Sequence, residues 1–85
     1  MIYEVKFVTS ALKESAKLPV DTRLRVDKAI LRLSENPRQG NVRPMVGTKS
    51  WRLRVGHYRV IYDIHDKKIV ILILRVGHRK NVYKK

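Results

Sequence analysis

Hydrophobic and polar positions divide the 85-residue chain into a first half with one strand and two helices and a second half of strands. Residues 2–8 are rich in β-formers and alternate in polarity, which predicts an opening strand. Two helices are expected at about 10–18 and 21–35, with a Thr or Ser N-cap before the first and Pro19 closing it. Asn36-Pro37 ends the second helix, because the residue before proline disfavours helical backbone angles.

The second helix has two chemically different sides. Its apolar positions predict an arc that packs on a core, and they are Leu24, Ile30, Leu31 and Leu33. The far side carries three basic residues, Arg25, Lys28 and Arg32. The simplest interpretation of that basic side is a solvated helix face.

Residues 36–49 contain two prolines and two glycines without periodicity, so they predict a long loop. From residue 50 the pattern changes to a period of two, which predicts strands at about 50–56, 58–65 and 68–76. Gly56-His57 suits a two-residue type II′ turn with glycine first, and Asp66-Lys67 suits a second tight turn. The nearly unbroken apolar run into residue 76 is typical of a central strand buried on both faces.

The expected fold is therefore α+β. It has an antiparallel sheet of about four strands, with the opening strand at one edge and the helical hairpin on one face. A single domain spans residues 1–85 and closes with a tail at 77–85.

Charge narrows the choice of partner. Twenty Lys and Arg oppose seven Asp and Glu, giving a formal net charge of +13. Self-repulsion on this scale destabilises a compact state, which favours a polyanionic partner over a merely soluble basic protein or a membrane-surface protein. The chain has no cysteine, no signal-peptide pattern and no membrane-length apolar run, which predicts a cytoplasmic protein without disulfides or Cys-based metal sites. No cofactor is expected.

A cluster of arginines follows from the strand register. The turn at Gly56-His57 places Arg54 opposite Arg59, and Arg52 lies two residues along on the same face. Like charges directly opposed across strands are destabilising, so a chain selected only for folding would place Thr or Glu at one of them. A ligand platform is therefore favoured over a basic but merely solvated sheet face.

The C-terminal tail offers further candidates. Gly77 is expected to let the chain leave the sheet and bring His78, Arg79 and Tyr83 towards the arginines. Arginine forks bind phosphate, and His or Tyr rings stack on unpaired bases, which together indicate RNA. Packing of the tail on the sheet is the alternative role for Tyr83, while His57 and His65 are interpreted as turn residues. Additional RNA contacts are predicted at Lys49, Arg75 and Lys80.

The strings WRLRVGHYRVIYDI and RVGHRKNVY resemble the RelE/ParE superfamily of toxins from toxin–antitoxin pairs, and are closest to its RelE branch. The resemblance covers essentially the whole chain. It implies a metal-independent endoribonuclease that cleaves mRNA in the ribosomal A site. In that reaction the ribose 2′-hydroxyl attacks the adjacent phosphate and leaves a 2′,3′-cyclic phosphate and a 5′-hydroxyl.

The resemblance also assigns roles to individual residues. Arg59 corresponds to the arginine that stabilises the transition state, Arg79 to one near the leaving group, and Tyr83 to a tyrosine that orients the nucleophile. Arg52 and Arg54 stand where well-known members have two lysines. Arginine does not lose its proton in proteins, so either His78 is the base or the chemistry is slow and leans on the ribosome.

The resemblance finally implies partners. These are an acidic, partly disordered antitoxin and the ribosome with its mRNA, whereas DNA is expected to be recognised through the antitoxin. Two alternatives share the fold: a ParE-like inhibitor of DNA gyrase without nuclease activity, and a degenerate member that binds only RNA or antitoxin.

Overall fold

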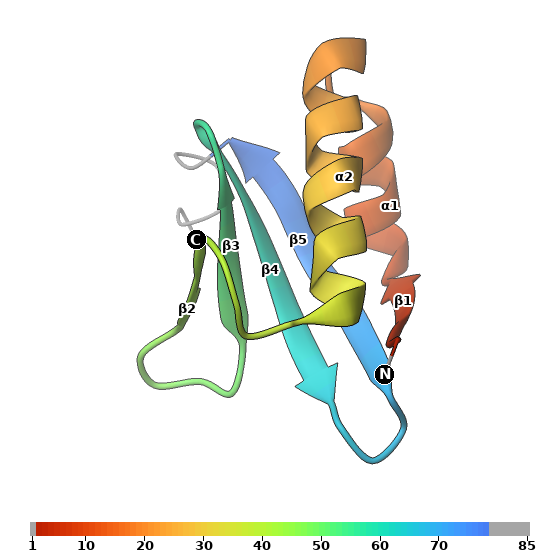
Figure 1. Ribbon diagram of the computed structural model, residues 1–85. Coiled ribbons are helices and arrows are strands. Elements are labelled where there is room, and N and C mark those ends of the chain that lie inside the picture. The colour runs from red at the N-terminus through yellow and green to blue at the C-terminus, as the bar shows by residue number, and fades with distance from the viewer. Residues whose placement is uncertain (1, 79–85) are drawn as a thin grey trace.

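The computed structural model describes residues 2–78 as a two-layer α+β domain, in which two helices cover one face of a sheet (Figure 1). The predicted fold class is confirmed. Among the described residues, neither helix is long and apolar enough to cross a membrane. The elements in chain order are β1 (Glu4–Phe7), α1 (Thr9–Ala16), α2 (Val20–Glu35), β2 (Val42–Pro44), β3 (Trp51–Val55), β4 (Tyr58–His65) and β5 (Val70–His78).

The sheet has five strands in the order β1-β5-β4-β3-β2, one more than expected. It is mixed, because β1 runs parallel to β5 while the other pairs are antiparallel. The additional strand, β2, lies inside the predicted loop at 36–49 and pairs with β3. Its three residues are too few for a period-two signal, and Pro44, which lacks an N–H, is tolerated because β2 forms an edge.

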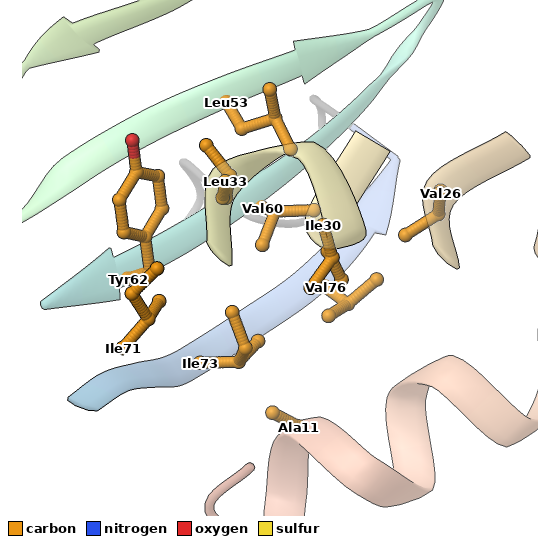
Figure 2. Packing of buried hydrophobic residues seen from close by; sticks show 10 residues of the cluster. All are labelled: Ala11, Val26, Ile30, Leu33, Leu53, Val60, Tyr62, Ile71, Ile73 and Val76. Carbon is orange, nitrogen blue, oxygen red and sulfur yellow. The ribbon is translucent and has the colours of Figure 1, made fainter. Parts of the chain in front are cut away.

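The core lies between the helices and the sheet (Figure 2). Four helical side chains meet six from the strands: Ala11, Val26, Ile30 and Leu33 against Leu53, Val60, Tyr62, Ile71, Ile73 and Val76. The predicted apolar arc of α2 is only half correct, because Leu24 and Leu31 are 56% and 68% exposed. The buried stripe instead begins at Thr22 and Val26, four residues apart on one helix face.

A bulge in β5 decides which of its residues reach the core. Ile61 pairs with Arg75 but Tyr62 pairs with Ile73, so Leu74 is an extra residue. An extra residue reverses the alternation of side chains beyond it. Val76 therefore joins the core and Arg75 does not.

The open edge of β5 beyond β1 is covered by α1. The Glu14 carboxylate accepts hydrogen bonds from the Val76 backbone N–H at 2.9 Å and from Arg75 Nε at 3.2 Å. The unpaired backbone groups of an exposed strand edge can pair with another chain. Glu14 prevents this at Val76 because its carboxylate accepts the hydrogen bond of that N–H. The same contact ties α1 to the sheet.

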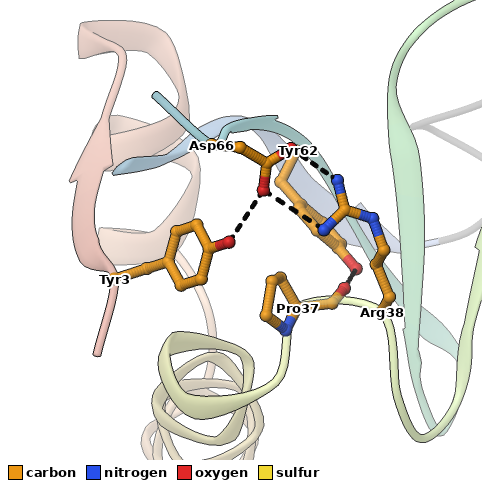
Figure 3. Close-up of polar contacts among 5 residues, drawn as sticks. All are labelled: Tyr3, Pro37, Arg38, Tyr62 and Asp66. Carbon is orange, nitrogen blue, oxygen red and sulfur yellow. Dashed lines mark hydrogen bonds and ion pairs between the residues drawn. The ribbon is translucent and has the colours of Figure 1, made fainter. Parts of the chain in front are cut away.

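A polar cluster joins the end of α2 to the β4–β5 connection (Figure 3). Arg38 donates to both carboxylate oxygens of Asp66, at 2.8 and 3.2 Å, and the Tyr3 hydroxyl donates to the same carboxylate at 2.7 Å. The buried Tyr62 hydroxyl donates to the Pro37 carbonyl at 2.6 Å, and burial raises the pKa of Tyr62.

The connection next to this cluster differs from the expected two-residue turn. It spans residues 66–69 and places Ile69 at a φ of 56°. That left-handed angle is uncommon for a β-branched side chain.

The Arg38–Asp66 pair gives the fold a pH dependence. Hydrogen bonds from Arg38 and Tyr3 hold the pKa of Asp66 below its usual value. The carboxylate therefore stabilises the fold above the unfolded-state pKa of about 3.9, and this stabilisation is lost as pH falls through the lower folded-state pKa. Asp66→Asn should lower the thermal midpoint at neutral pH, and its difference from wild type should shrink in acid.

Thermal melts at a series of pH values measure this difference. Asp27→Asn removes the same charge from an exposed position of α2 and is the matched control. A deficit for Asp66→Asn that stays constant down to strongly acidic pH would contradict the account.

Candidate functional site

The β3–β4 turn fixes the register of the candidate site. Gly56 has a φ of 59°, and Ile69 is the one non-glycine residue within 2–78 with a positive φ. A positive angle at Gly56 but not at His57 is the pattern of a type II′ turn. Arg54 consequently pairs with Arg59, as the sequence predicts.

Arginines then gather in two neighbouring rows across the sheet, on the face away from the helices. The first row joins Arg43, Arg52, Ile61 and Arg75 on four successive strands. The second joins Arg54, Arg59 and Gly77. Since Gly77 has no side chain, this residue places nothing larger than hydrogen beside Arg59.

These rows border a pocket of about 160 Å³. Four guanidinium groups line it, from Arg43, Arg52, Arg54 and Arg59, together with Gly40, Asn41 and Val42. The Arg54 backbone N–H donates to the Asn41 carbonyl at 2.9 Å, which holds the segment before β2 against β3. The wall that contains Arg43 therefore depends on this short edge strand.

Arg43 is the site residue that sequence reasoning missed. It lies in a segment without periodicity, so no pattern connected it with the arginines of β3 and β4. Only the pairing of Arg43 with Arg52 brings it to the pocket. A second basic residue in the same predicted loop, Lys49, is exposed and does not line the pocket.

Arg59 is the least exposed of the four arginines. It is 6% exposed, and its Nη1 donates to the carbonyls of Gly56 and Tyr58 at 3.2 and 3.1 Å. Its Nε is buried and has no hydrogen-bond acceptor within residues 2–78. A buried, incompletely bonded cation is costly unless a negative group neutralises it.

The other charges around the pocket do not relieve that cost. Arg43, Arg54 and Arg59 form no ion pair with any described residue, since the carboxylates that form ion pairs there are Glu14 and Asp66. An anion that enters the pocket would therefore meet several cations at once. Arginine suits phosphate here because its planar fork donates two parallel hydrogen bonds.

The prediction that the chain leaves the sheet at Gly77 is wrong. Strand β5 continues to His78, which pairs with Tyr58 and shares its face of the sheet. The His78 ring stands edge-on to Tyr58 at 5.6 Å and is stacked with His57 at 6.2 Å. Tyr58 and Arg59 are consecutive in a strand and point to opposite faces, so His78 is not brought into the arginine pocket.

The remaining predicted residues have separate outcomes. Arg75 shares a row with Arg52 but forms an ion pair with Glu14 at 3.2 Å and does not line the pocket. Arg79, Lys80 and Tyr83 lie outside the described residues. Within the described part of the chain, no cluster of His, Asp and Glu could hold a metal ion.

Comparison with known proteins identifies the family. The sequence model of the ParE toxin of type II toxin–antitoxin systems, parDE, matches residues 5–83. The chain belongs to this family. It is a toxin of a type II toxin–antitoxin system.

Several family members with determined names or structures are similar over nearly their full length. The mRNA interferase toxin RelE of Escherichia coli K12 is 33% identical over 94% of this chain and 86% of its own. Toxin RelG of Mycobacterium tuberculosis is 38% identical over the whole of both chains. A toxin–antitoxin complex, RelBE2 of M. tuberculosis, contains a chain with a TM-score of 0.84 and 33% identity, covering 93% of this chain and 100% of that one.

Arg54 lies directly opposite Arg59, so we expect that replacing Arg54 stabilises the fold and weakens anion binding. Arg54→Glu converts a like-charge cross-strand pair into an opposite-charge pair, and such pairs differ by roughly 0.5–1 kcal/mol. Urea unfolding should therefore show a gain of that size in the free energy of unfolding, accompanied by weaker anion binding.

Lys13→Glu makes the same change in net charge on exposed α1 and serves as the control. If both variants gain equally, relief of overall repulsion explains the effect and the cross-strand pair does not.

Proposed function

We propose that this toxin is a ribosome-dependent endoribonuclease that cleaves mRNA in the A site without a metal. The ribose 2′-hydroxyl would attack the adjacent phosphate, forming a 2′,3′-cyclic phosphate and releasing a 5′-hydroxyl. The observation that carries the proposal is the pocket in which three arginines surround the buried Arg59. Relatives named mRNA interferases support the same substrate.

Arg59 is assigned the central electrostatic role. Negative charge increases on the phosphate oxygens as the 2′-oxygen attacks, and a preorganised cation in a water-poor site stabilises that change. The guanidinium is already positioned by the carbonyls of Gly56 and Tyr58, so little reorganisation is needed. Its unsatisfied Nε is a donor available for an oxygen of the substrate.

The other arginines are assigned to binding and alignment. Arg52 and Arg54 follow one another on the same face of β3, and Arg43 faces Arg52 from β2. Contacts to the phosphates next to the scissile one would hold the 2′-hydroxyl in line for attack, which is a large part of catalysis in such reactions. Arg79, Lys80 and Tyr83 retain the leaving-group, binding and orienting roles implied by the resemblance.

The pocket supplies no general base of its own. Arginine stays protonated at any physiological pH, and within residues 2–78 the charged side chains of the pocket are all arginines. His78 is the proposed base. Its ring packs against Tyr58 on the opposite face of the sheet from Arg59, so it would have to change position to reach the substrate. The alternative within the same proposal is a slow reaction in which the ribosome aligns the 2′-hydroxyl.

Lys49 and Arg75 are proposed as RNA contacts outside the pocket.

Metal independence is proposed on the same basis. Four arginines around one small pocket repel a divalent cation, whereas they can themselves neutralise the developing charge. The proposed partners are an acidic antitoxin and the ribosome with bound mRNA. Solved relatives include RelB–RelE complexes, among them the intact E. coli complex at 29% identity and a TM-score of 0.80.

Substitution of Arg59 tests the nuclease directly. In a translating extract, wild type should cleave mRNA within A-site codons, and primer extension locates the cuts. Arg59→Ala should reduce the cleavage rate by about 100-fold or more, the usual effect of removing a preorganised donor. Arg59→Lys keeps the charge but loses the fork, and should also be strongly impaired.

Lys67→Ala removes an exposed cation far from the pocket and should cleave like wild type. Circular dichroism checks that each variant is folded. Intact mRNA together with gyrase-dependent DNA breaks would reject the nuclease and support the ParE-like alternative, which the name of the matching family model brings into consideration.

A further inference from the structure

A second basic groove adjoins the arginine pocket. It has a volume of about 360 Å³ and runs between α2 and the end of β3. Its cations are Arg25, Lys28 and Arg32 from α2 and Arg54 from β3. The basic side of α2 is therefore more than a solvated helix face. It forms one wall of the groove, and Arg54, which also lines the arginine pocket, belongs to the opposite wall.

The two hollows are neighbours that share part of their lining. Asn41 and Arg54 line both the pocket and the groove, so they stand at the boundary between them. A smaller hollow of about 190 Å³ lies between the same elements and is lined by Arg32 and Arg54 as well as by Asn41. A chain molecule that extends from the pocket past Arg54 would reach the groove next, and none of the described residues that line the groove is acidic.

The α2 cations are arranged to act together. Spacings of three and four residues place Arg25, Lys28 and Arg32 on one helix face, over a length of about 10 Å. All three are exposed, and none forms an ion pair within residues 2–78. The acidic residues of the same helix, Asp21, Asp27 and Glu35, form no ion pair with them. The fold therefore keeps three like charges together that it could have paired.

We propose that the groove is a second RNA subsite. Single-stranded RNA would leave the arginine pocket at Arg54 and lie along α2, with its phosphates against Arg25, Lys28 and Arg32. This inference rests on the proposed nuclease function, because it extends the path of the same substrate. The described residues that line the groove include no aromatic side chain, so the proposed contacts are to the RNA backbone and independent of base sequence.

The experiment compares short and long RNA. Fluorescence anisotropy measures binding of 2′-O-methyl oligonucleotides, which lack the nucleophile, with lengths of about 4 and about 16 nucleotides. The variant Arg25→Gln/Lys28→Gln/Arg32→Gln should bind the long RNA about 10-fold or more weakly and the short RNA as wild type does. The slope of log K against log salt for the long RNA should fall by about 2, since each phosphate contact contributes about 0.7.

The matched control is Lys13→Gln/Lys17→Gln/Lys67→Gln, which removes the same three charges from the net +13 at exposed positions outside the groove. It should bind both RNAs nearly as wild type does. Equal weakening of long RNA by the two triple variants would overturn the proposal, because net charge alone would then explain binding. Unchanged RNA binding by the groove variant with lost binding of an acidic antitoxin would also overturn it and make the groove a protein interface.

Failure of the nuclease proposal gives a different result. In that case the wild-type protein would leave mRNA intact in the translating extract, regardless of the affinity for long RNA that fluorescence anisotropy measures. If wild type cleaves mRNA and the groove variant binds long RNA normally, only the second subsite fails.

Discussion

The turn at Gly56-His57 is the constraint on which the site depends. Its positive φ at Gly56 fixes how β3 pairs with β4, and that pairing sets Arg54 directly against Arg59. A slip of one residue would send these arginines to the helix face and the core side chains to the opposite face. Core packing therefore enforces the same register that concentrates the charge. The chain cannot relax the repulsion between the arginines without losing the burial of Leu53 and Val60.

That repulsion is offset at places distant from the pocket. The Tyr62–Pro37 hydrogen bond and the Arg38–Asp66 pair join the end of α2 to the β4–β5 connection. Glu14 fastens α1 to the edge of β5 at the opposite side of the sheet. Within residues 2–78, Glu14 and Asp66 are the carboxylates that form ion pairs, and neither of them lines the arginine pocket. Asp66 and Glu14 stabilise the contacts between the helices and the sheet, whereas the pocket lined by Arg43, Arg52, Arg54 and Arg59 keeps a positive charge that suits a polyanion.

The sequence predicted the parts of the fold that follow local rules. Period two, a glycine-first turn and the Asn36-Pro37 helix stop gave the strand meander, the helical hairpin and the opposition of Arg54 and Arg59. It could not give β2, because a three-residue edge strand exists only through pairing with β3. It also could not give the bulge at Leu74, which is a matter of register between β4 and β5. The parallel pairing of β1 is a long-range contact of the same kind.

Those missed features account for the errors at the candidate site. Without β2, Arg43 was hidden in a loop, and without the extension of β5, His78 was expected beside the arginines. The bulge explains why Arg75 turns away from the core while Val76 enters it. The resemblance to a toxin family added the expected chemistry, but a pocket walled by arginines differs from one with lysines because an arginine keeps its proton and cannot act as a base. We therefore propose that the arginines of the sheet bind the substrate and stabilise its charge, and that groups outside the pocket transfer the proton.

The central claim is that Arg59 binds the scissile phosphate through its buried Nε–H, which has no acceptor within residues 2–78. The most direct measurement is nuclear magnetic resonance of the arginine Nε–H groups during titration with a short 2′-O-methyl RNA. The account predicts that the Arg59 Nε–H signal shifts and becomes protected from exchange with water at the same RNA concentration at which Arg54 and Arg43 respond. A saturating titration in which Arg59 is unchanged while exposed arginines elsewhere shift would contradict it.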